Sequence, residues 1–66
     1  MIIKLYDQTI DTRQIKKLHN DIKRLYDMKL KKNIKVKYCV EMTNDNFVII
    51  DKQEYKMLRK ILNNEN

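Results

Sequence analysis

The chain has 66 residues and a mass of 8.1 kDa, with fifteen Lys or Arg, nine Asp or Glu and a formal net charge of +6. It contains no Gly, no Pro, no Trp and a single Cys. A chain near this length buries only about 60% of its unfolded surface, which predicts one small compact domain over residues 1–66 with a thin core. The lack of Gly excludes glycine-rich phosphate-binding loops, and a single Cys excludes an internal disulfide or a cysteine-rich zinc site.

The first half of the chain predicts a strand followed by a long helix. Two β-branched isoleucines open the chain, and residues 2–6 are expected to form a short strand. Asp11 and Gln14 then have the spacing of a capping box at the start of a helix. After them an apolar residue recurs every three or four positions, which predicts a helix over residues 12–31. The residues of this apolar stripe are Ile15, Leu18, Ile22 and Leu25.

Residues 34–43 carry the clearest pattern, because apolar and polar side chains alternate throughout. This period of two predicts a half-buried strand that places Cys39 on its outward face. Residues 44–46 are Asn, Asp and Asn, which favour a turn, and residues 47–50 are apolar on both faces. We therefore expect a hairpin of residues 34–43 and 47–50, whose second strand is central or covered on both sides.

A second capping box, made by Asp51 and Glu54, precedes a final helix that the apolar spacing predicts over residues 52–62. The predicted order of elements is therefore βαββα. Residues 2–6 are expected to join the sheet of the hairpin through a helical crossover. The expected fold is α+β, a small two-layer βαββα sandwich in which a three-stranded sheet carries two helices on one face.

Few residues support catalysis or metal binding. His19 is the only imidazole, and no Asp or Glu lies at a ligand-like spacing around it, so we expect it at the boundary of the core. Cys39 has no His or other base among its strand neighbours, and the chain contains no Ser nucleophile. We expect no enzymatic activity, no metal site and no cofactor.

The positive charge lies in the first part of the chain. Residues 1–40 hold eleven Lys or Arg and four Asp or Glu, whereas residues 41–66 hold four and five. Six cations of the predicted helix 12–31 fall on the arc opposite its apolar stripe, where like charges repel one another unless an anion neutralises them. Two lysines of the next strand extend this surface. The candidate binding residues are Arg13, Lys16, Lys17, Lys23, Arg24, Lys31, Lys35 and Lys37.

These features predict a small non-enzymatic binding protein whose basic helix face contacts the phosphates of DNA or RNA. The alternative is a phage-type or plasmid-type inhibitor or regulator, which binds an acidic groove or a nucleic-acid enzyme of the host. No apolar run reaches the length of a signal peptide or membrane span, so we expect a cytoplasmic protein without a membrane partner. The outward sheet face is expected to be open, and a homodimer through that face is a further expectation.

Overall fold

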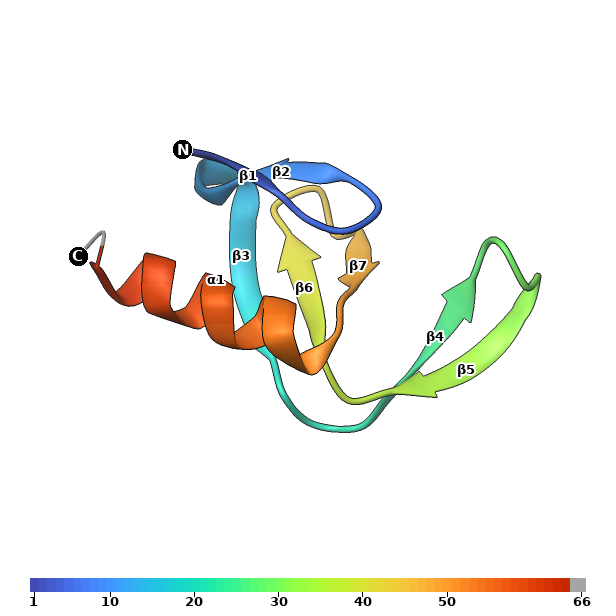
Figure 1. Cartoon of the computed structure of the whole chain (residues 1–66). Coiled ribbons are helices and arrows are strands. Elements are labelled where there is room, and N and C mark those ends of the chain that lie inside the picture. Colours follow the sequence, from blue (N-terminus) through green and yellow to red (C-terminus); the bar gives the residue numbers. More distant parts are fainter. Residues whose placement is uncertain (65–66) are drawn as a thin grey trace.

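The computed structural model describes residues 1–64, and in them seven short strands, one turn of 3-10 helix and one α-helix (Figure 1). The strands form three antiparallel sheets, ordered β1-β2, β3-β6-β7 and β4-β5. The α+β class is confirmed, but the two predicted helices on a single sheet are wrong. Residues 65 and 66 of the predicted domain lie outside the described residues. The elements are β1 (Ile2–Lys4), β2 (Thr9–Asp11), η1 (Thr12–Gln14), β3 (Ile15–His19), β4 (Lys23–Asp27), β5 (Lys32–Val36), β6 (Cys39–Met42), β7 (Phe47–Ile49) and α1 (Lys52–Asn64).

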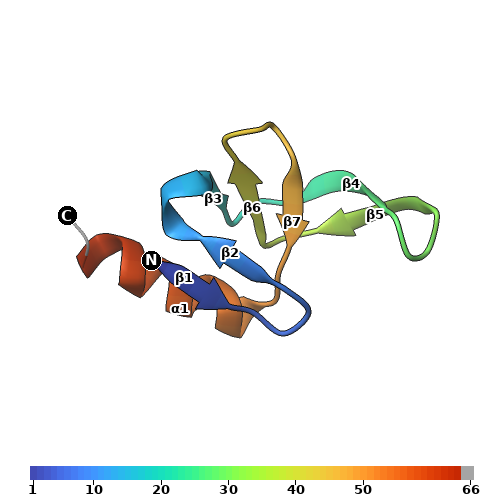
Figure 2. The same ribbon diagram turned by 90° about the horizontal axis from the view of Figure 1, so that it is seen from above.

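The N-terminal segment forms a hairpin of its own. β1 runs antiparallel to β2, and the buried side chains of Ile3 and Ile10 stand opposite each other. The backbone N–H of Leu5 donates to the carbonyl oxygen of Gln8 at 2.6 Å, which closes the turn between the strands. The predicted strand 2–6 is therefore shorter than expected, and it does not join the sheet of β6 and β7. Figure 2 shows β1 lying over α1 in the view from above.

The helix predicted over residues 12–31 is not formed. Only Thr12–Gln14 make a single turn of 3-10 helix, and the Asp11 side chain caps it by accepting from the backbone N–H of Arg13 at 3.0 Å. The predicted capping residue is thus correct, but it caps one turn instead of five. The chain then continues as β3, a short connection and β4.

Pairing with a distant segment explains why residues 15–19 are a strand, whereas residues 23–27 pair with the adjacent β5. β3 lies beside β6, with His19 opposite Cys39. The step of three residues from Ile15 to Leu18, which indicates a helix, fits this strand because the register shifts by a β-bulge after Ile15. Hydrogen bonds and packing in the sheet override a local helical pattern that the repulsion between neighbouring cations already weakens.

The strand predicted over residues 34–43 is two strands in different sheets. β5 pairs with β4, whereas β6 lies between β3 and β7. The alternation fails at Cys39 and Val40, which are successive residues and both fully buried, so Cys39 does not face outward. The hairpin of β6 and β7 is confirmed, and Asp45 in its turn adopts the left-handed conformation with φ of 67°. β7 is an edge strand and not a central one.

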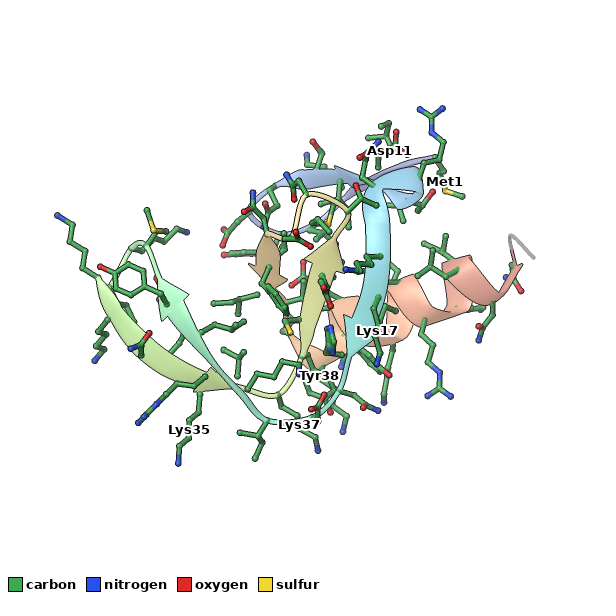
Figure 3. All side chains as sticks on the ribbon, turned by 180° about the vertical axis from the view of Figure 1, so that it is seen from behind. Met1, Asp11, Lys17, Lys35, Lys37 and Tyr38 are labelled. Atoms are coloured by element: carbon green, nitrogen blue, oxygen red, sulfur yellow. The ribbon has the colours of Figure 1, made fainter. Side chains whose placement is uncertain are left out.

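β4, β5 and their connecting turn form an arm, defined here as residues 22–37, that projects away from the other elements (Figures 1 and 2). Five consecutive cross-strand pairs join its two strands. Figure 3 shows Lys35 on the arm, at a distance from Lys17 on β3. None of the buried apolar residues of the core comes from the arm. Because a two-stranded ribbon has little stability of its own, its shape depends on its hydrogen-bond ladder and its turn.

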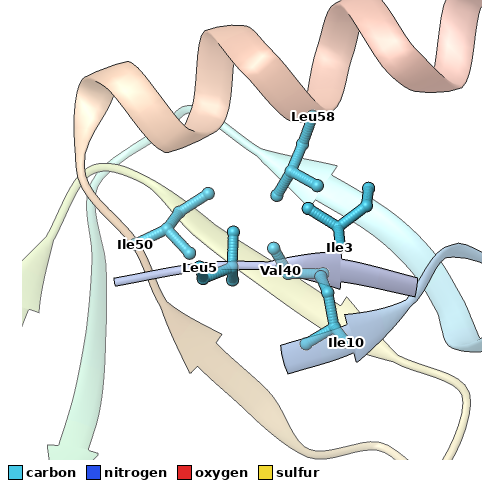
Figure 4. Packing of buried hydrophobic residues seen from close by; sticks show 6 residues of the cluster. All are labelled: Ile3, Leu5, Ile10, Val40, Ile50 and Leu58. Atoms are coloured by element: carbon cyan, nitrogen blue, oxygen red, sulfur yellow. The ribbon is translucent and has the colours of Figure 1, made fainter. Parts of the chain in front are cut away.

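α1 confirms the predicted final helix and closes the core. In its capping box, the backbone N–H of Glu54 donates to Asp51 Oδ1 at 2.7 Å, and the backbone N–H of Asp51 donates to Glu54 Oε1 at 3.1 Å. The helix extends beyond the predicted range of 52–62 to Asn64. Leu58 points from α1 toward Ile3 (Figure 4). The buried apolar residues that form the core cluster are Ile3, Leu5, Ile10, Val40, Ile50 and Leu58.

Truncation of Leu58 is expected to remove much of the stability. Its side chain is fully buried, and replacing a buried leucine by alanine costs about 2–5 kcal/mol. At roughly 0.05–0.15 kcal/mol per residue, a chain of this size has a free energy of unfolding of only about 3–10 kcal/mol. Urea denaturation followed by circular dichroism should therefore show Leu58→Ala largely unfolded or with a much lower midpoint.

Leu30→Ala is the matched control, because Leu30 lies on the arm and is 58% exposed. Its free energy of unfolding should stay within about 0.5 kcal/mol of the wild-type value. Equal losses in the two variants would contradict the placement of the core between α1 and the strands.

Candidate functional site

The eight candidate binding residues do not form one surface, because they come from different elements and several of them are ion-paired. Arg13 in η1 donates from Nη2 to Asp11 Oδ2 at 2.8 Å and from Nε to the same carboxylate. This pair raises the pKa of Arg13 and holds the pKa of Asp11 well below its usual range. Lys23 Nζ, at the start of β4, lies 3.5 Å from Asp21 Oδ2. Both cations therefore have an anionic partner within the chain.

Glu41 on β6 binds two residues of the neighbouring β3. Its Oε1 lies 2.9 Å from His19 Nε2, and its Oε2 lies 3.4 Å from Lys16 Nζ. The hydrogen bond with His19, assisted by Lys16, lowers the pKa of Glu41. The His19 ring is buried at 8% exposure and stacks on Phe47 with a centroid distance of 5.7 Å. The cluster joins β3 to β6 and neutralises Lys16, the third paired cation of the predicted set.

The other five predicted cations take no part in an ion pair within residues 1–64. One of them, Lys17, stands alone on β3. The remaining four belong to the arm, on β4, on the turn, on β5 and directly after β5. They are Arg24, Lys31, Lys35 and Lys37.

The arm accounts for the whole net charge of the chain. Residues 22–37 contain seven Lys or Arg and one Asp, whereas the other fifty residues contain eight cations and eight anions. The charge of +6 is thus concentrated on a two-stranded ribbon, and the rest of the molecule is formally neutral. Lys23 and Lys29 pair with carboxylates outside the arm, and the other five cations of the arm have no ion pair within residues 1–64. The candidate positive surface is therefore a projecting hairpin and not the predicted helix face.

Strand register divides the arm into two faces. On the outer face, which we define as Arg24, Tyr26, Asn33 and Lys35, all four side chains are exposed. Arg24 stands opposite Lys35, and Tyr26 stands opposite Asn33. Like charges directly opposite each other destabilise a strand pair. Within the arm the outer face therefore has an unbalanced repulsion, which a bound anion would relieve.

The turn of the arm is held by Asp27, its only acidic residue. The Asp27 carboxylate accepts from the backbone N–H groups of Lys29 and Leu30 at 2.8 and 3.0 Å. Lys31 follows in the left-handed conformation with φ of 54°, and its N–H donates to the carbonyl oxygen of Asp27 at 2.7 Å. Lys29 Nζ also reaches Asp7 Oδ2 at 3.4 Å, in an exposed ion pair between the tip and the β1–β2 turn. Asp27 thus shapes the tip without an ion pair to the outer face.

A second positive surface, not predicted from the sequence, lies where the arm meets α1. It is a hollow of about 550 Å³, which we call the α1 groove. The rings of Tyr38 and Tyr55 are part of its lining, with centroids 5.0 Å apart, and Lys37 Nζ lies 5.6 Å from the Tyr38 centroid. Among the described residues 1–64, its lining contains five cations and no carboxylate. The lining residues are Asn20, Lys37, Tyr38, Lys52, Tyr55, Lys56, Arg59, Lys60, Asn63 and Asn64.

A signal for the α1 groove was present in the sequence. Lys52, Lys56 and Lys60 are spaced by four residues, which places them along one side of a helix. The net charge of residues 41–66 hides these lysines, because acidic residues of the turns and of the capping box cancel their charge when the whole range is summed. A sum over the helix alone would have shown its positive balance.

Cys39, the candidate nucleophile, lies in the buried core. Cys39 is fully buried, and this desolvation raises the pKa of its thiol, which disfavours the reactive thiolate. Within residues 1–64 no group of three His, Cys, Asp or Glu side chains is placed to hold a metal ion. No helix among these residues is long and apolar enough to cross a membrane.

Comparisons with protein-family models, with curated proteins and with solved structures find no match to this chain. The arm and the α1 groove are therefore the observations from which a function can be inferred.

The Glu41 cluster predicts acid sensitivity. Because the folded-state pKa of Glu41 is lowered, its ionic contribution is present above its usual pKa of 4.5 and is lost as the pH falls through the folded-state value. Glu41→Gln should therefore have a lower Tm than the wild type at pH 7, and the two Tm values should converge as the pH falls below about 4. Thermal unfolding from pH 3 to pH 7 measures this.

Asp7→Asn provides the control, since within residues 1–64 the Asp7 side chain forms a single ion pair, the exposed one with Lys29. Its Tm should follow the wild-type curve closely at every pH. A Tm difference for Glu41→Gln that stays constant over the whole range would show that the ionised carboxylate is not what stabilises the cluster.

Proposed function

We propose that this protein is a non-enzymatic nucleic-acid binder that docks the outer face of its arm on the phosphate backbone. The supporting observation is the location of the entire net charge on one projecting ribbon. Lys and Arg that neutralise phosphates release condensed counterions, which gives affinity without base readout. A two-stranded β-ribbon also has dimensions that the major groove of a duplex accepts.

The geometry of the outer face suits this role better than the predicted helix would. Arg24 and Lys35 are on neighbouring strands and directly opposite, so both can approach the same stretch of phosphates. Tyr26 stands beside them and is 55% exposed, although it is a large aromatic residue. The paired residues Arg13, Lys16 and Lys23 are not needed, because the unpaired cations of the arm provide the charge.

A single charge reversal on the outer face gives a sharp test. Lys35→Glu places a carboxylate opposite Arg24, so it should stabilise the arm slightly, by about 0.2–1 kcal/mol. The same change should weaken binding to a fluorescein-labelled 20-base-pair duplex about tenfold in fluorescence anisotropy. The plot of log K against log salt has a negative slope, and its magnitude should fall by about one or more. Stability and binding therefore move in opposite directions, which a general loss of folding cannot produce.

Lys4→Glu is the matched control, because Lys4 is exposed on β1, stands opposite Thr9 and has no ion pair within residues 1–64. It changes the net charge by the same amount and should weaken binding much less than Lys35→Glu. Equal weakening by the two variants would show that binding depends on the net charge of the chain and not on the outer face, which would contradict the proposal. Failure of the wild type to bind any duplex or single strand at low salt would overturn the proposal.

A second candidate function is binding to an acidic protein surface, as an inhibitor or regulator of the phage or plasmid type. The observation that favours it is the apolar tip of the arm, where Met28 and Leu30 are 78% and 58% exposed among lysines. Exposed apolar residues rimmed by charge are typical of protein interfaces.

Substitution of the tip separates the two functions. Met28→Ser combined with Leu30→Ser should leave duplex affinity unchanged if the outer face binds phosphates. If the arm binds a protein, this variant should instead lose a stoichiometric acidic partner that the wild type retains after nuclease treatment. Size-exclusion chromatography of the nuclease-treated complex measures this, and full retention of the partner by the variant would contradict a role for the tip.

A further inference from the structure

Within residues 1–64, the α1 groove is a positively charged hollow whose cations have no anionic partner. Its five cations come from the segment after β5 and from α1, and none of them has an ion pair within residues 1–64. A hollow lined by one sign of charge focuses the potential and raises the local concentration of anions. Its volume of about 550 Å³ lies in the size range of small-ligand sites, and the groove is open to solvent. The groove is therefore suited to an anion larger than a simple salt ion.

The other lining residues indicate what this anion carries. Tyr38 and Tyr55 supply aromatic surface, and both rings are half-buried, so the groove presents fixed rings instead of mobile ones. Asn20 and Asn63 add amide groups that both donate and accept hydrogen bonds. Aromatic surface next to cations and amides is the combination that binds an unpaired base together with its phosphate.

The position of the groove connects it with the arm. Lys35 belongs to the outer face, Lys37 lines the groove, and only one residue separates them. Figure 3 shows Lys35, Lys37 and Tyr38 following one another from the arm toward β6. A polyanion that contacts Lys35 on the arm can therefore also contact Lys37 at the edge of the groove.

We infer that the α1 groove binds an unpaired nucleotide of single-stranded nucleic acid, with its phosphates on the lysines of α1 and its base against the two tyrosines. This inference rests on the proposed function and narrows its ligand from polyanions in general to single strands. A duplex can contact the arm, but it keeps its bases stacked inside the helix and cannot place one on Tyr38 or Tyr55.

The first test compares a labelled fifteen-residue oligothymidylate and the corresponding oligouridylate with a fifteen-base-pair duplex, using Lys56→Glu. Lys56 lies between Lys52 and Lys60 at spacings of four, so the change replaces like-charge contacts by favourable ones and the helix stays folded. It should weaken binding of the single strands about tenfold. Its effect on the duplex should not exceed that of Lys4→Glu, the control on β1.

The second test detects the base directly. The chain contains no Trp, so Tyr55→Trp places in the groove a single tryptophan that can be excited selectively over the remaining tyrosines. Stacking should quench its emission when the single strand is added, whereas the duplex should leave it unchanged. In the wild-type chain, labelled with nitrogen-15, the same titration should shift the amide resonances of Asn20 and of residues 52–60.

The outcomes separate this inference from the function on which it rests. If Lys35→Glu weakens both ligands but Lys56→Glu affects them equally and neither quenching nor amide shifts occur, the groove does not bind a base and the inference is overturned. If no ligand binds the wild type, the proposed function itself fails. If Lys56→Glu weakens binding of the oligouridylate more than binding of the oligothymidylate, the favoured ligand is RNA. The reverse order would favour DNA.

Discussion

The pairing of His19 with Cys39 in the β3–β6 ladder is the constraint on which the rest of the structure depends. The chain leaves the central sheet after His19 and has to return beside the same residue at Cys39. The intervening segment 20–38 can therefore only run out and back, and the shortest ordered way to do so is an antiparallel hairpin. The arm thus follows from the pairing of His19 with Cys39, two residues that lie outside the arm. The same ladder places Glu41 next to His19 and buries Val40 under α1.

This division gives the two parts of the molecule different physical origins. The neutral part is held by apolar residues from β1, β2, β6, α1 and the segments beside them, and by ion pairs in which acidic residues compensate Arg13 and Lys16. The arm has no buried apolar residue of that core, and its one carboxylate, Asp27, is used for its turn. Cations that would destabilise a packed element are tolerated on a ribbon, because both of its strands remain in contact with water. The price of this arrangement is a weakly stabilised arm.

Local signals in the sequence predicted two parts of the fold that depend on local contacts, but not the local hairpins β1–β2 and β4–β5. The capping box of Asp51 and Glu54 and the turn at residues 44–46 each act within a few residues, and α1 and the β6–β7 hairpin follow from them. The helix prediction failed at residues 15–19 because their partner, β6, lies some twenty residues away and because a β-bulge after Ile15 gives a strand the spacing of a helix. Residues 23–27 pair instead with the adjacent β5, a hairpin that the helical spacing did not indicate. For the candidate site, sequence reasoning found Arg24 and Lys35 but assigned them to a helix and a strand that do not exist as predicted. The ion pair of Lys16 with Glu41 depends on the β3–β6 pairing and could not be foreseen, whereas Arg13 and Lys23 are paired with carboxylates only two residues away.

The arm and the α1 groove are linked mechanically as well as electrostatically. The carbonyl oxygen of Tyr38 accepts from the backbone N–H of Ile50 at 3.2 Å, and the Tyr38 ring packs on Tyr55, so the chain is fixed to the fold directly after the arm ends. Farther out, the ion pair of Lys29 with Asp7 joins the tip to the body, and both side chains are well exposed to solvent. Such a pair contributes little to the free energy of folding. A ligand that contacts both the outer face and the groove would therefore order the arm against the body, and the entropy lost in doing so would reduce its affinity. The fixed rings of Tyr38 and Tyr55 limit that loss at the groove, so an anion that enters the groove first leaves only the outer part of the arm to be ordered.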